Sequence, residues 1–215
     1  MERKSEGKAD QGVFILKYRS ITTAGELVSR VISSLELLTP PEEAVCYSLL
    51  NAFLLQLYSG VINDVRCIDV QRSSDGIYFV DSAGDEDALP PRSADITKVY
   101  ADGYEYERVG EEYPEQLIGM GDHFYKISGD DAIILLGRDM PRVVCVSVRA
   151  LPLLYSESDA QRELCLPEEF LPLAEARLRS DIYRLEGEDS LCANWTNEYN
   201  AILARFGAWL EVHSE

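Results

Sequence analysis

The stretch Leu49-Leu50-Asn51-Ala52-Phe53-Leu54-Leu55-Gln56-Leu57-Tyr58 lies within the longest part of the chain that has no charged residue, 44–63. Its apolar residues recur three or four positions apart, which predicts a helix. They form a broad stripe, so we expect this helix to be buried on more than one side. The apolar set is Leu49, Leu50, Phe53, Leu54, Leu57, Tyr58 and Val61.

The same segment is long enough to cross a membrane. It contains Ser48, Asn51, Gln56 and Ser59, however, and carboxylates rather than lysine or arginine flank it. Anionic flanks on both sides are unfavourable for a membrane span. We therefore expect a core helix and no membrane association.

A second helix is predicted just before this one. Thr23-x-x-Glu26 is a capping box, and apolar residues follow it with the spacing of one helical face. In the stretch between the two helices, Thr39 is a plausible N-cap for the uncharged helix, with prolines in the first turn. Gly60 is the expected end of that helix, within a few residues.

From Val65 to Leu151 the pattern changes to short β-prone runs separated by turn residues. Asp102-Gly103 and Gly129-Asp130 predict tight hairpins. The expected strands are 65–70, 77–80, 96–100, 104–109, 124–127, 133–136 and 143–148.

Helical spacing returns after Leu164. Leu166-Pro167-Glu168-Glu169-Phe170 indicates a helix start, and Pro172 indicates a short turn before the main helix. A last helix is expected from Glu188 to about Val212. The predicted fold class is α+β: a helical bundle of two N-terminal and two C-terminal helices with a small antiparallel β-insert. We expect a single domain, 1–215, with its helical core in 22–63 and 164–213 and the β-rich insertion in 64–152.

The chain has 215 residues and a net charge of −18. Such an acidic surface disfavours proteins that coat nucleic acid and proteins that bind anionic membranes. The charge is uneven, since Asp75 to Asp131 holds 15 acidic and 4 basic residues.

Residues with catalytic or metal-binding chemistry are sparse. His123 follows Asp122, but neighbours along a strand point to opposite faces, so a turn or strand-edge histidine is favoured over a catalytic one. The acidic run Asp81–Asp87 lacks the alternating ligands of a calcium loop, and a solvated loop is the favoured interpretation. The five cysteines are unclustered, so we expect reduced, mostly buried thiols. No catalytic residue, metal site or cofactor is predicted.

Several motifs, taken in order, carry a family resemblance. The first is the stretch Leu49-Leu50-Asn51-Ala52 in the uncharged helix, with a Leu-Tyr near the end of that helix, here Leu57-Tyr58. A Leu-Pro precedes an Ile-x-x-Val strand in Leu89–Val99, and Leu-Pro-x-x-Phe (166–170) leads into a helix containing alanines. A final helix carries spaced aromatic residues. In this order, from Thr22 to Val212, the chain resembles the head-to-tail adaptor (connector or neck) proteins of tailed bacteriophages. Pro172 and the acidic Asp81–Asp87 insertion depart from the family pattern.

The resemblance implies a structural virion protein and not an enzyme. Adaptors form a ring, usually a dodecamer, that binds the portal protein above and tail or neck proteins below. DNA passes through the central channel without sequence-specific binding. The expected location is the virion, and the host cytoplasm before assembly. Adaptors can also stay monomeric until they meet the portal.

The aromatic residues of the last helix have two interpretations. They form either core or a docking surface for another subunit. The candidate interface residues are Trp195, Tyr199, Phe206 and Trp209, together with Phe170. Two other functions stay open: a cytoplasmic bacterial protein-interaction module without catalytic activity, and, less favoured, a metal-assisted hydrolase.

Overall fold

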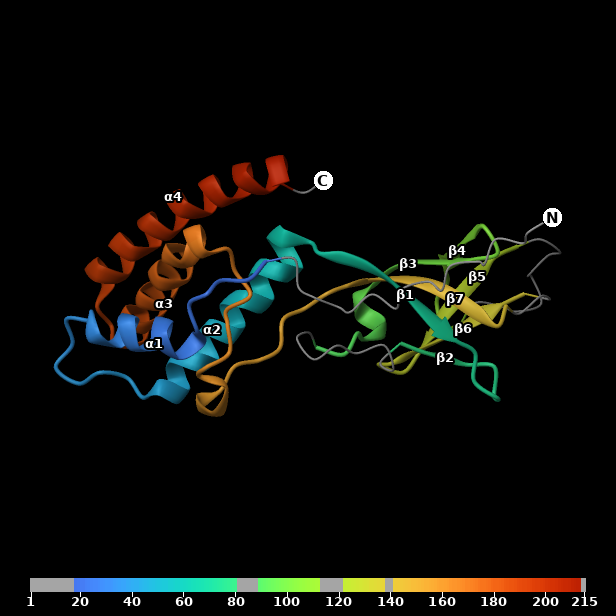
Figure 1. The fold of residues 1–215 in the computed structure, drawn as a ribbon, viewed down its shortest axis with the longest axis horizontal. Helices are drawn as coiled ribbons and strands as arrows, with labels where there is room; N and C mark the ends of the chain where they lie inside the picture. Colours follow the sequence, from blue (N-terminus) through green and yellow to red (C-terminus); the bar gives the residue numbers. More distant parts are fainter. Residues whose placement is uncertain (1–17, 81–88, 113–121, 138–140, 214–215) are drawn as a thin grey trace, which may run out of the picture.

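The computed structural model describes residues 18–80, 89–112, 122–137 and 141–213. Figure 1 shows an elongated molecule with the four α-helices gathered at one end and the strands at the other. The helices come from both ends of the chain, and the strands come from its middle. We call the four helices and their connections the helical body.

The N-terminal helices are α1 (Ala24–Ser33) and α2 (Glu43–Leu57), which continues as the π-helix η1 (Tyr58–Ile62). The predicted capping box of α1 is confirmed: the Glu26 amide donates to the Thr23 hydroxyl, and the Thr23 amide donates to the Glu26 carboxylate. The prediction of Thr39 as the cap of α2 is wrong, because this helix begins later, after Glu42.

The C-terminal helices are α3 (Leu171–Leu185) and α4 (Asp189–His213). The short 3-10 turns η5 (Glu157–Asp159) and η6 (Glu168–Phe170) precede them. The short turn predicted before the main helix is thus confirmed. Pro172 is accommodated in the first turn of α3, where its missing N–H costs no helical hydrogen bond.

All seven predicted strands form, and no end differs from the predicted one by more than one residue. They are β1 (Val65–Gln71), β2 (Tyr78–Phe79), β3 (Ile96–Ala101), β4 (Tyr104–Arg108), β5 (Phe124–Ser128), β6 (Ala132–Leu136) and β7 (Val143–Arg149), with the 3-10 turn η3 (Ser93–Asp95) before β3. Positive φ angles at Asp102 and Gly103 make the β3–β4 hairpin tight. Gly129 has the same left-handed φ in the loop between β5 and β6.

The strands form one sheet in the order β1-β7-β3-β4-β5-β6-β2. The β4–β5 pair is parallel and the other pairs are antiparallel. The two end strands approach each other through a bridge between Arg72 and Tyr78, so the sheet is nearly closed, like a barrel.

This sheet corrects the predicted fold class. The fold is dominated by a seven-stranded, nearly closed mixed sheet plus four helices, and it is not a helical bundle with a small antiparallel insert. The sequence pattern located the strands, but it carried no information on their order or on the parallel β4–β5 pair. Those features depend on contacts between residues far apart in the chain.

The buried side chains form two separate clusters. One joins α1, α2, α3 and α4 with the segments around Leu151 and Leu164. The other lies inside the sheet and includes Tyr78, Val99, Ile133 and Val146. A curved sheet of seven strands buries its own inner face, which is why the insertion has a core of its own.

Three hydrogen bonds fasten α2 and η1 to the segments that return from the sheet. The Asn51 amide donates to the Tyr155 carbonyl at 2.8 Å, and the Tyr155 N–H donates to the Asn51 Oδ1 at 2.7 Å. The Tyr58 hydroxyl donates to the Cys165 carbonyl at 2.9 Å. Burial, followed by the nearby Cys165, raises the pKa of Tyr58 far above its usual value, so this phenol stays a donor.

A carboxylate attaches the chain segment before α1 to the start of η6. Glu168 accepts from the Thr22 hydroxyl at 2.7 Å and from the amides of Ile21 and Thr22 at 3.0 and 3.2 Å. The Thr22 hydroxyl contributes most to holding the pKa of Glu168 below its usual range, and the two amides and the positive charge of Arg30 lower it further.

Glu168→Gln is therefore expected to lower stability at neutral pH and to make little difference in acid. A carboxyl group whose pKa is lower in the folded state than in the unfolded state stabilises the fold at pH values above its unfolded-state pKa. This stabilisation is lost as the pH falls through the folded-state pKa. Because the group is solvent-screened, we expect a loss of about 2 °C in Tm at pH 7. Thermal unfolding of both proteins at pH 7 and pH 3.5 tests this, with Glu169→Gln as control. A loss of equal size at both pH values would contradict it.

Candidate functional surfaces

Two of the five predicted interface residues lie in the core of the helical body. Phe206 is fully buried and Phe170 is 5% exposed, and their ring centroids are 4.7 Å apart. Both offer almost no surface to another subunit in this structure. For these two residues the structure favours the core interpretation.

The other three aromatic residues are half-buried at the edge of the same core. Trp209 contacts Phe170, Tyr18 and His213, with its ring stacked on the histidine at 4.2 Å. The His213 Nδ1 lies 2.8 Å from the Trp209 carbonyl, within hydrogen-bonding distance. The exposed end of α4 therefore carries an ordered aromatic pair.

Trp195 and Tyr199 are covered in part by cations from α3. The Arg179 guanidinium lies 4.4 Å from the centre of the Trp195 ring, and that of Arg177 lies 5.4 Å from the Tyr199 ring. These contacts join α4 to α3. Docking to another subunit stays a prediction for Trp195, Tyr199 and Trp209.

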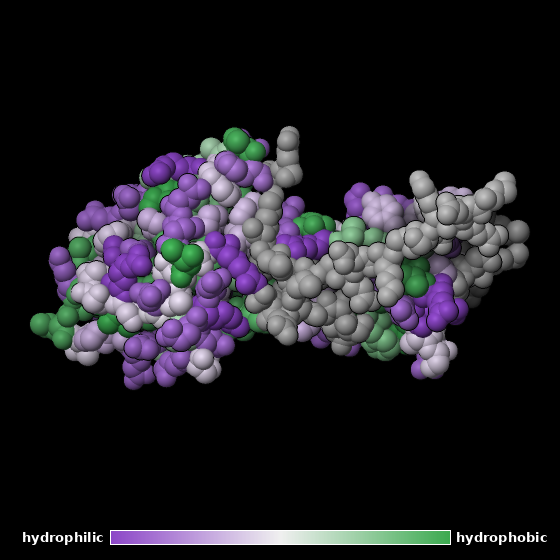
Figure 2. Space-filling view, in the orientation of Figure 1, coloured by the Kyte–Doolittle hydropathy of each residue, from purple (hydrophilic) through white to green (hydrophobic). Residues whose placement is uncertain are grey.

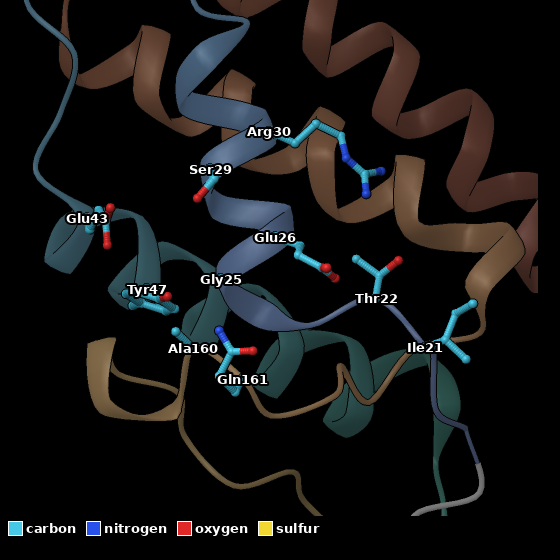
Figure 3. A pocket seen from close by; sticks show the side chains of 10 residues that line it. All are labelled: Ile21, Thr22, Gly25, Glu26, Ser29, Arg30, Glu43, Tyr47, Ala160 and Gln161. Carbon is cyan, nitrogen blue, oxygen red and sulfur yellow. The ribbon is translucent and has the colours of Figure 1, made fainter.

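An open cavity of about 720 Å³ lies where α1, α2 and the segment after η5 meet. Figure 3 shows Gly25, Glu26 and Ser29 on α1, Glu43 and Tyr47 at the start of α2, and Ala160 and Gln161 opposite them. Gly25 is required here, because an added Cβ would lie 2.9 Å from Ala160. Sequence patterns did not predict this cavity, because three separate segments of the chain form it.

The cavity contains polar groups that already have partners. Glu26 belongs to the capping box, and Arg30 pairs with Glu175 at 2.9 Å. Burial raises the pKa of Tyr47, which keeps the phenol protonated and makes it a poor nucleophile. The residues lining the cavity include neither histidine nor cysteine.

The other residues with catalytic or metal-binding chemistry lie outside this cavity. His123 stacks on Tyr104 with ring centroids 4.3 Å apart and meets Tyr106 edge-on. Across the described ranges, no group of three or more histidine, cysteine, aspartate or glutamate side chains is placed to hold a metal ion. The acidic run Asp81–Asp87 lies outside those ranges.

The five cysteines are all free thiols. The expectation that most are buried is wrong: Cys46 and Cys165 are buried, Cys145 and Cys192 are partly exposed, and Cys67 is exposed. Burial, followed by a hydrogen bond with Cys67, raises the pKa of Cys145 to about 11. That thiol is therefore protonated and unreactive at neutral pH.

One surface feature revises the prediction for the uncharged helix. By length and composition alone, 43–62 passes the test for a membrane-crossing helix, yet Leu50, Phe53, Leu54 and Leu57 point into the core. The opposite face of the helix is exposed, so the expectation of burial on more than one side is wrong there. The exposed residues are Val45, Ser48, Ala52, Gln56 and Ser59.

On the side of the molecule shown in Figure 2, hydrophilic residues cover most of the helical body, with scattered hydrophobic spots. A scan against protein-family models finds no match for this chain, and a search of curated proteins finds none either. Function is therefore inferred from the residues and their arrangement.

Proposed function

We propose that this chain is a structural head-to-tail adaptor of a tailed bacteriophage, forming a ring beneath the portal, and that it is not an enzyme. One observation carries the proposal. Two of the motifs that give the family resemblance, around Leu50-Asn51 and around Leu166–Phe170, are far apart in the sequence but pack in the same hydrophobic cluster. Their shared packing supports the interpretation that they are parts of one helical arrangement.

The motif residues also have defined contacts in this cluster. Asn51 pairs with both backbone groups of Tyr155, while Tyr58 donates to Cys165, directly before Leu166. Phe170 contacts Phe206 and Trp209 of the aromatic last helix. Three of the four motifs thus lie in the helical core, while Ile96 and Val99 of the Leu89–Val99 motif lie in the sheet core.

The charge of the chain agrees with a role in a DNA channel. A net charge of −18 repels DNA phosphates, so a ring of such subunits would let DNA slide without binding it. In this proposal the partners are the portal protein and the tail or neck proteins, and assembly is into a dodecamer. The protein is in the host cytoplasm before assembly and in the virion afterwards.

The test is to measure the chain in purified particles. Phage induced from the source culture are purified on a density gradient, and the chain is quantified by mass spectrometry against the portal protein. We expect co-purification at a copy number similar to that of the portal. Absence from intact, tailed particles would overturn the proposal and favour the interaction-module function.

A further inference from the structure

Two of the five cysteines lie side by side on the outer face of the sheet. Cys67 of β1 is directly opposite Ser147 of β7. Cys145 of β7 is directly opposite Asp69 of β1. Alternate residues of a strand share a face, so all four side chains lie on the same side of the sheet. The side chains between them along both strands are buried in the sheet core, so these four point outward.

The two thiols reach each other across the strands. They occupy diagonal positions in neighbouring residue pairs, where the Cα atoms are about 7–8 Å apart and side chains can still meet. A hydrogen bond joins Cys67 and Cys145. The Ser147 hydroxyl lies 3.3 Å from the Cys67 sulfur, so it holds that side chain over β7. The register of the two strands therefore makes a pair of thiols out of two cysteines that are far apart in the sequence.

The two thiols differ in their access to solvent and in their charge. Cys67 is exposed, whereas Cys145 is partly covered. Burial, followed by the hydrogen bond with Cys67 and the negative charge of Asp69, raises the pKa of Cys145 to about 11, so this thiol keeps its proton. Cys67 is therefore the thiol that meets a dissolved oxidant. Cys145 is unreactive toward the oxidant itself but is placed to react with the Cys67 sulfur.

We propose that Cys67 and Cys145 form an oxidisable pair, which a hydroperoxide converts into a reversible disulfide between β1 and β7. In the first step the Cys67 thiolate attacks one oxygen of hydrogen peroxide, the O–O bond breaks, and a sulfenic acid and hydroxide form. In the second step the Cys145 sulfur attacks the Cys67 sulfur, and the Cys145 proton leaves with the hydroxyl group as water. The hydroxide takes up the proton that Cys67 lost, so two thiols and one peroxide give one disulfide and two waters.

The diagonal placement favours a labile disulfide over a structural one. Disulfides usually join Cα atoms about 4.4–6.8 Å apart, so the two strands must approach slightly for this bond to close, and the bond stores strain. Strained or exposed disulfides are the ones that are most easily reduced. We therefore expect an excess of reduced glutathione to reopen the bond.

The crosslink would restrain the chain where it enters and leaves the sheet. β1 follows η1 directly, and β7 leads to Ala150 and Leu151 of the helical core. Figure 1 shows the two strands side by side in the sheet. A disulfide between them closes a loop that contains β2 to β6, which restricts the unfolding of the sheet. The pair does not depend on the proposed adaptor function.

Peptide mapping of the full chain tests the pair. The reduced protein is treated with hydrogen peroxide, its remaining thiols are blocked with N-ethylmaleimide, and it is digested without reductant for mass spectrometry. We expect the main product to be a monomer that has lost two hydrogen atoms, about 2 Da, and that yields a peptide linking Cys67 to Cys145. Treatment with reduced glutathione before blocking is expected to restore both thiols.

Three variants assign the linkage. Cys67→Ser and Cys145→Ser are each expected to abolish it. Cys192→Ser is the matched control and is expected to retain it, because Cys192 is also partly exposed but lies in α4. In Cys145→Ser, the sulfenic acid of Cys67 has no second thiol to attack it, so we expect dimedone to trap it. Circular dichroism verifies that each variant is folded.

Two kinds of result overturn the pair. In the first, the native chain shows Cys67 only as sulfinic or sulfonic acid, or linked to a second chain, with no peptide joining it to Cys145. In the second, the linkage forms but an excess of reduced glutathione does not open it, which would make it a structural disulfide and not a reversible one.

Discussion

Phe206→Ala is expected to destabilise the helical body by about 3–5 kcal/mol, since it leaves a cavity in a packed core. Phe206 is fully buried between Phe170 and Trp209, at centroid distances of 4.7 and 6.1 Å. Its loss removes a large apolar side chain and the ring contacts on both sides. Chemical denaturation followed by circular dichroism at 222 nm measures the change. Such a loss is a large part of the total stability of an ordinary domain, about 5–15 kcal/mol.

The control for this variant is Phe79→Ala in β2. Phe79 is 40% exposed, so its side chain buries less apolar area on folding than that of Phe206. We therefore expect the free energy of unfolding to fall by about 1 kcal/mol. Equal losses for the two variants would show that Phe206 is not the buried centre of the α3–α4 packing.

Asn51→Leu is expected to cost about 2–5 kcal/mol, because it leaves two backbone groups unpaired. The Asn51 side chain accepts from the Tyr155 N–H and donates to the Tyr155 carbonyl, and Tyr155 is 3% exposed. Leucine is similar in size but can replace neither hydrogen bond. The free energy of unfolding from a urea titration gives the magnitude.

Two variants separate this effect from a general response to leucine. Asn51→Asp keeps the acceptor for the Tyr155 N–H and loses the donor, so an intermediate loss is expected. Asn200→Leu on the exposed side of α4 is expected to change stability by about 0.5 kcal/mol or less. A loss for Asn51→Leu no larger than that for Asn200→Leu would contradict the paired contact with Tyr155.

Part of the candidate interface was predictable from helical periodicity. The spacing of Trp195, Tyr199, Phe206 and Trp209 correctly placed them on one side of a helix. Periodicity alone does not tell which of them another helix covers completely. That depended on Phe170 and Tyr18, which reach the α4 aromatics from elsewhere in the chain.

The uncharged segment of α2 also shows that a sequence pattern does not tell which side chains are covered. The lack of charge was read as burial on more than one side, but Val45, Ser48 and Ala52 are exposed. Composition shows that a surface tolerates an apolar environment, and it does not show whether this chain or another molecule supplies that environment. The cavity beside Tyr47 was equally hidden, since three distant segments form it.

The sequence by itself determined the features that depend on neighbouring residues. The capping box at Thr23 and Glu26, the turn at Asp102-Gly103, the seven strands and the helices all follow from local hydrogen bonding, backbone preference and periodicity. Only the tertiary structure decided the strand order, the near-closure of the sheet between Arg72 and Tyr78, and the separation of two cores. A strand's pattern shows which of its faces is buried but not which partner lies beside it, and that choice depends on how the whole sheet curves to bury its inner face.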